Sequence, residues 1–83
     1  MNIVLGNLPK GVSEKDIREF FLHIAKVLKV TIFNNTETKH SMYECIVDID
    51  ISDRVAASIL AKRINHTIWK GASISAHLLI FED

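Results

Sequence analysis

The sequence predicts an α+β fold in which a four-stranded antiparallel sheet carries two helices on one face. Three observations support this prediction. Period-two and helical patterns follow one another in the order strand, helix, strand, strand, helix, strand. Residues 43–51 alternate cleanly between inward and outward side chains. Only three glycines and one proline interrupt the 83 residues, so the elements are closely spaced. With right-handed crossovers, this βαββαβ order gives a ferredoxin-like sandwich.

Length and composition indicate one globular domain spanning residues 1–83. With 48% hydrophobic residues, the chain has enough apolar side chains for a core. It contains neither an apolar run that would span a bilayer nor a cleavable leader pattern, so we expect a soluble, cytoplasmic protein without a membrane partner. A strand that begins at residue 2 fits the natural start of a short protein. The single cysteine, Cys45, excludes an internal disulfide and is expected to be buried.

The first half of the chain predicts a strand over residues 3–8, which Pro9 ends. Ser13 is a typical N-cap for a helix that should end near Ala25. The expected inward stripe of this helix is Ile17, Phe20, Phe21 and Ile24. A second strand covers residues 27–33, with Val30 and Ile32 on one face and Lys29, Thr31 and Phe33 on the other. Residues 34–41 form a polar connection.

The second half begins with a strand over residues 43–51. Its expected inward residues are Tyr43, Cys45, Val47, Ile49 and Ile51, and its outward residues are Glu44, Ile46, Asp48 and Asp50. A helix begins at Ser52–Asp53 and ends at Asn65, a residue that tolerates the left-handed conformation. Its inward stripe is Ala57, Leu60, Ala61 and Ile64. Residues 68–71 form a turn or short hairpin, and residues 72–81 form the last strand.

Several short segments resemble the RNA recognition motif (RRM) family, and their spacing extends the resemblance over nearly the whole chain. The segments are Ile3 to Leu8, Asn7-Leu8-Pro9, Ser13-Glu14, Asp16-Ile17 with Phe21, Met42 to Ile51, Ile64-Asn65, Gly71, Ile74 and Ala76. The resemblance implies a non-enzymatic module without a cofactor that binds single-stranded RNA on its open sheet face.

The chain departs from this family where bases usually stack. Val4 occupies the aromatic position of the first strand. The octamer of the third strand is either Met42 to Ile49 or Glu44 to Ile51, and neither register places an aromatic ring outward. Stacking contributes about 1–3 kcal/mol per base, so losing three rings removes several kcal/mol, more than a thousandfold in affinity if nothing compensates. Ten basic residues also only balance ten acidic ones, so we expect weak RNA binding at most.

The leading prediction is weak single-stranded RNA binding through a set of sheet and edge residues. Phe33 and His77 are the available stacking side chains. Alternatively, the polar connection half-covers Phe33. The alternative for His77 is a surface position without a functional role. The full predicted set is Val4, Asn7, Lys29, Phe33, Lys39, His40, Ile46 and His77.

The competing prediction is a protein-interaction or homodimerisation domain that has lost RNA binding. Leu22, Val55 and Ile59 lie opposite the inward stripes of their helices and would form an apolar patch. Trp69 either covers the end of the second helix or serves the partner contact of a peptide-binding RRM subclass, although the arginine of that subclass motif is absent.

Metal binding and catalysis have little support in the sequence. The four histidines, His23, His40, His66 and His77, lie in four separate elements, so no metal site is expected. No arrangement of a nucleophile with a histidine and an acid is evident, and an enzyme is therefore the third alternative.

Overall fold

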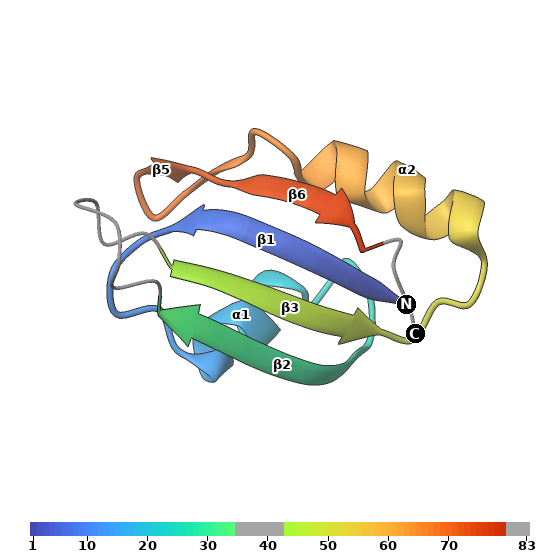
Figure 1. The fold of residues 1–83 in the computed structure, drawn as a ribbon, viewed down its shortest axis with the longest axis horizontal. Coiled ribbons are helices and arrows are strands. Elements are labelled where there is room, and N and C mark those ends of the chain that lie inside the picture. Colours follow the sequence, from blue (N-terminus) through green and yellow to red (C-terminus); the bar gives the residue numbers. More distant parts are fainter. Residues whose placement is uncertain (35–42, 80–83) are drawn as a thin grey trace.

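The computed structural model describes residues 1–34 and 43–79. Its elements are β1 (Asn2–Leu8), α1 (Glu14–Phe20), β2 (Val27–Asn34), β3 (Tyr43–Ile49), α2 (Arg54–Ile64), β4 (Ile68–Trp69), β5 (Ala72–Ser73) and β6 (Ser75–Leu78). The main sheet is antiparallel with the order β2-β3-β1-β6, and β4 pairs with β5 in a small hairpin. The helices leave one face of the sheet uncovered, with α1 behind β2 and β3 and α2 beside β6 (Figure 1). The predicted ferredoxin-like α+β fold is confirmed.

The core forms between the sheet and the helices. Its fully buried residues are Ile3, Leu5, Ile17, Phe21, Cys45, Val47, Ile49, Ala57 and Ile74. The inward alternation predicted for β3 is confirmed, although the strand ends at Ile49 and not at Ile51. Tyr43 and Ile51 are partly buried against the core. Among the described residues, no polar or charged side chain is buried.

Helix α1 begins as predicted and ends earlier. The Asp16 N–H donates to Ser13 Oγ at 3.2 Å, and the Ser13 N–H donates to Asp16 Oδ2 at 3.0 Å, which completes a capping box. The helix ends at Phe20, and the carbonyl of Phe21 accepts the N–H groups of both Ile24 and Ala25 in the following turn. This tight turn directs the chain toward β2 and leaves Ile24 41% exposed, so the prediction that Ile24 lies in the inward stripe is wrong.

Helix α2 begins at the predicted cap and ends differently. The Asp53 carboxylate accepts the Val55 N–H at 3.0 Å. At the other end, the left-handed residue is His66, with φ of 70°, whereas Asn65 has φ of −58°. The prediction of a left-handed Asn65 is therefore wrong. Asn65 Oδ1 instead accepts the Ala76 N–H of β6 at 3.0 Å, which joins the end of the helix to the sheet.

The predicted strand over residues 72–81 is divided at Ile74 because its two parts have different partners. Ala72 and Ser73 pair with β4 through a hairpin whose turn residues, Lys70 and Gly71, both have positive φ. Ile74 exchanges backbone hydrogen bonds with the loop at residues 66–67, and β6 then pairs with β1. Residues 80 and 81 lie outside the described residues.

Candidate nucleic-acid interface

The register of the sheet arranges its open face in rows. One row runs from Lys29 on β2 through Asp48 on β3 to Asn2 on β1. The next row is Thr31, Ile46, Val4 and His77. The third row begins with Phe33 and Glu44. All these side chains alternate with the buried residues of the same strands, so they face away from the helices.

The centre of the open face is aliphatic. Val4 and Ile46 are direct register partners there, and both are partly buried. The outward residues of β3 are Glu44, Ile46 and Asp48, so neither proposed octamer register presents a ring. Within the described part of this face, Phe33 is the aromatic side chain that lies open, at 48% exposure. The described part of this face therefore offers the ring of Phe33 and, on β6, the imidazole of His77 for base stacking, in place of three platform aromatics.

A hollow over β2 and β3 brings part of the predicted site together. It has a volume of about 310 Å³ and is lined by Asn2, Lys29, Thr31, Phe33, Ile46 and Asp48. This volume lies near the lower end of the usual range for small-molecule sites, about 300–1,000 Å³. Lys29, Phe33 and Ile46 were in the predicted set. Thr31 and Asp48 were not, although the period-two patterns of their strands placed both on this face. No face was predicted for Asn2.

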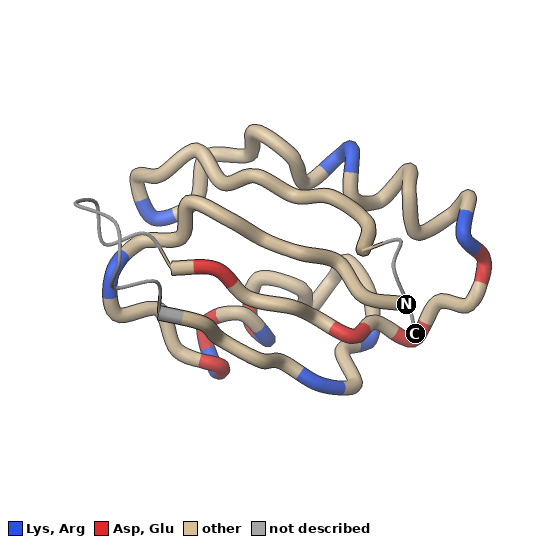
Figure 2. Tube along the Cα trace, viewed as in Figure 1, with Lys and Arg blue, Asp and Glu red and all other residues tan. Residues whose placement is uncertain are grey.

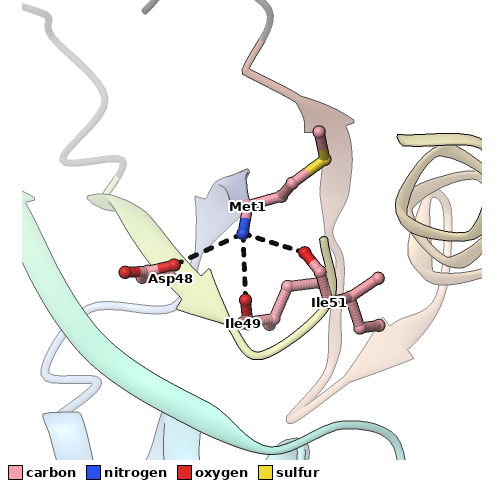
Figure 3. A network of polar contacts seen from close by, with 4 residues as sticks. All are labelled: Met1, Asp48, Ile49 and Ile51. Carbon is pink, nitrogen blue, oxygen red and sulfur yellow. Dashed lines mark hydrogen bonds and ion pairs between the residues drawn. The ribbon is translucent and has the colours of Figure 1, made fainter. Parts of the chain in front are cut away.

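Asp48 lies in a network with the amino terminus (Figure 3). The Met1 ammonium is 3.5 Å from Asp48 Oδ1, and it donates hydrogen bonds to the carbonyls of Ile49 at 2.9 Å and Ile51 at 3.1 Å. This positive charge opposes the negative charge of Asp48. Glu44, in contrast, is exposed at the other end of β3. The Asp48 end of β3 is therefore less repulsive toward a polyanion than the Glu44 end.

Asn7 has a structural role outside the hollow. It lies in the irregular part of β1 between Leu5 and Leu8 and has a positive φ of 57°. Its Nδ2 donates to the Ser73 carbonyl at 2.7 Å, which joins β1 to β5. An asparagine tolerates this left-handed backbone better than most residues do. Its predicted contact with RNA would have to coexist with this hydrogen bond.

The other predicted RNA-contact residues either lie away from the hollow or fall outside the described part of the chain. Val4 is the register partner of both Ile46 and His77, so His77 lies on β6, across β1 from the hollow. Lys39 and His40 fall outside the described residues. Figure 2 shows basic residues scattered along the trace, with acidic positions along β3. No continuous basic stripe reinforces the open face in the part of the chain that is described.

The residues of the predicted protein-interaction patch lie in different places. Val55 and Ile59 are exposed and line a groove of about 590 Å³ between α2 and β6, together with Arg54, Lys62 and Leu78. Leu22 is also exposed but lines separate hollows around α1. The structure does not bring these three residues into one hollow.

Trp69 is partly buried, and its ring packs on the first helix. The ring centroids of Trp69 and Phe20 are 5.1 Å apart, and Lys70 Nζ lies 5.6 Å from the Trp69 centroid. The Trp69 ring thus already has partners within the protein, Phe20 and Lys70. The predicted packing position was the end of the second helix, whereas the aromatic partner comes from α1.

The thiol of Cys45 is buried in the core. Burial raises the pKa of the Cys45 thiol to about 12, although a backbone hydrogen bond from Leu5 opposes this shift, so the thiolate is scarce at neutral pH. Across residues 1–34 and 43–79, no three His, Cys, Asp or Glu side chains gather as a metal site requires. None of the helices described is long and apolar enough to cross a membrane.

A four-stranded antiparallel sheet with an open face and two helices behind it is the architecture of an RNA recognition motif. The sequence matches the RNA recognition motif family over residues 3–68, and the chain belongs to this family. Domains of this family are generally RNA-binding modules and not enzymes.

Solved structures with this fold include two RRM domains. The third RRM of Pes4 has a TM-score of 0.76 and 17% identity, over 99% of this chain and 94% of that chain. The third RRM of Mip6 has a TM-score of 0.71 and 20% identity, over 90% of this chain and 87% of that chain. No curated protein matches the sequence.

Proposed function

We propose that this chain binds single-stranded RNA weakly through the β2–β3 half of its open face. The observation that carries the proposal is the hollow in which Lys29, Phe33 and Ile46 come together. An aromatic ring, a cation and an aliphatic surface are the elements that contact base, phosphate and sugar in single-strand binding.

The composition of the face sets the expected affinity. One base stacks on Phe33, which contributes about 1–3 kcal/mol. Val4 and Ile46 provide apolar contact without an aromatic face, and the chain has no net positive charge to add a large phosphate contribution. The dissociation constant is therefore expected between roughly 0.1 and 1 mM, where binding free energies are about −5.5 to −4 kcal/mol.

An NMR titration at low salt tests the proposal. A mixed-sequence RNA of about eight nucleotides, within the usual site size of single-strand binders, is added to the isotope-labelled chain. We expect backbone amide shifts at Thr31, Phe33, Ile46 and Asp48, and a clear loss of affinity in Phe33→Ala. Leu28→Ala is the matched control, because Leu28 is exposed on the same strand but does not line the hollow. Absence of shifts at millimolar RNA would overturn the proposal.

The second candidate is a protein-interaction or homodimerisation role through α2. Val55 and Ile59 give the groove beside β6 two exposed aliphatic side chains on one helix face. For this role, amide shifts at Val55 and Ile59 should change with protein concentration in the absence of RNA. Val55→Ser would suppress that change, whereas Leu22→Ser, in the turn that follows α1, would not.

A further inference from the structure

We propose that the open-face hollow selects guanine, with Asp48 and Lys29 reading its Watson–Crick edge. This inference rests on the proposed RNA-binding function and names the base that the site prefers. It follows from the position of two opposite charges at one end of the hollow and the Phe33 ring at the other.

The register places the two charged residues side by side. Lys29 on β2 and Asp48 on β3 are cross-strand partners, and both line the hollow. Thr31 and Ile46, the next pair along these strands, form its middle, and Phe33 lies beyond them. A base that lies over Thr31 and Ile46 therefore has an aromatic side chain at one end and a donor–acceptor pair at the other.

Both charged side chains have hydrogen-bonding capacity left for a ligand. Among the ion pairs within 4.0 Å in the described residues, none includes Lys29. Asp48 is 40% exposed, and its contact with the Met1 ammonium uses Oδ1, at the long distance of 3.5 Å. Within residues 1–34 and 43–79, Oδ2 has no such contact. Asn2, which follows Asp48 in the same row, adds an amide with both a donor and an acceptor.

Guanine is the base whose edge fits this pair best. It presents the O6 acceptor beside two adjacent donors, N1–H and the 2-amino group. A carboxylate accepts two parallel N–H donors in a bidentate arrangement, and a lysine ammonium donates to a carbonyl oxygen. Uracil has one donor between two carbonyls, and adenine and cytosine have one amino group beside an acceptor nitrogen. These three bases can therefore give the carboxylate only one of the two bonds.

The test uses a set of uridine heptamers that carry guanine, adenine, cytosine or uracil at the central position. Affinities are measured by NMR titration of the intact chain at low salt. We expect the guanine heptamer to bind at least about fivefold more tightly than the all-uridine one, the lower end of what a bidentate base contact discriminates. Inosine at the centre lacks only the 2-amino group and should lose most of this preference.

Two carboxylate variants assign the preference to a residue. Asp48→Asn should reduce the guanine-to-uracil ratio to about one while uridine binding persists, because the carboxamide cannot accept two N–H bonds on the same edge. Glu44→Gln, on the same strand but outside the hollow, should retain the ratio. Retained amide spectra confirm that both variants are folded.

The outcomes separate this inference from the function on which it rests. Equal affinity for all four heptamers would overturn guanine selection and leave RNA binding in place. A guanine preference that survives Asp48→Asn would overturn the reading of the guanine edge by Asp48. No binding to any heptamer would overturn both.

Discussion

The ring of Trp69 lies against that of Phe20, with centroids 5.1 Å apart and planes inclined at 56°. Phe20 in turn meets the buried ring of Phe21 edge-on at 5.3 Å. Lys70, the next residue in the hairpin turn, lies near both the Trp69 ring and Asp16 of α1, whose Oδ1 is 3.9 Å from Lys70 Nζ. The β4–β5 hairpin is thus joined to the first helix through aromatic contacts.

Trp69→Ala should destabilise the chain strongly. The substitution removes a partly buried indole and the face on which Phe20 packs, so we expect the free energy of unfolding to fall by roughly 3 kcal/mol. Trp69→Phe should recover much of this loss. Urea denaturation followed by circular dichroism measures both. The neighbouring Ile68 is exposed, and Ile68→Ala should change stability by less than about 0.5 kcal/mol. Equal effects of Trp69→Ala and Ile68→Ala would contradict the anchoring role.

Asn65→Ala should loosen the contact between α2 and β6. Without Oδ1, the partly buried Ala76 N–H loses its acceptor, which costs about 1–3 kcal/mol. Hydrogen exchange of the Ala76 amide should accelerate beyond that of other β6 amides. Asn65→Asp retains an oxygen at this position and serves as the control. If the Ala76 amide exchanges at the wild-type rate in Asn65→Ala, the hydrogen bond to Asn65 does not stabilise the contact between α2 and β6.

Acid should remove the contribution of the α1 capping box. Hydrogen bonds from the backbone N–H and then the hydroxyl of Ser13 lower the pKa of Asp16 below that of an ordinary aspartate. Because the folded pKa is depressed, the stabilisation is present above the pKa of the unfolded chain and is lost as pH falls through the folded pKa. The stability difference between the wild type and Asp16→Asn should therefore shrink below about pH 4. Glu19→Gln, on the same helix, is the control, and a constant difference for Asp16→Asn would refute the linkage.

Cys45 should react with thiol reagents only when the protein unfolds. Its side chain is fully buried, and burial raises its pKa to about 12. At mildly alkaline pH, labelling of the native chain should follow the unfolding equilibrium and accelerate in Trp69→Ala. An exposed thiol introduced by Ser52→Cys in a Cys45→Val background should react immediately. Equally fast labelling of native Cys45 would show that β3 opens locally.

The features that the sequence predicted well depend on local patterns. Cys45, Val47 and Ile49 are buried because side chains alternate on a strand, and no distant residue is needed to deduce this. The caps at Ser13 and Asp53 were also predictable, since each side chain bonds a backbone N–H two or three residues later.

The features that the sequence did not predict depend on distant partners. Asn65 was interpreted from its conformational preference, but its side chain bonds β6 eleven residues later. Ile74 divides the strand predicted over residues 72–81 because its backbone pairs with the loop at residues 66–67. In the hollow, Phe33 was predicted from strand alternation. Asp48 was predicted only as an outward residue of its strand, because its proximity to the Met1 ammonium requires the folded sheet.

Because β2 is an edge strand, Lys29 has a second role in protecting that edge. In the described sheet, β2 pairs only with β3, so its other side presents unpaired backbone groups. Within residues 27–33, Lys29 is the one charged side chain in an otherwise aliphatic, aromatic and threonine segment. Such a lysine acts as a gatekeeper against edge-to-edge aggregation. Neutralising it should lower solubility as well as affinity for a nucleotide, and light scattering would reveal this effect, whereas Lys29→Arg would preserve the protection.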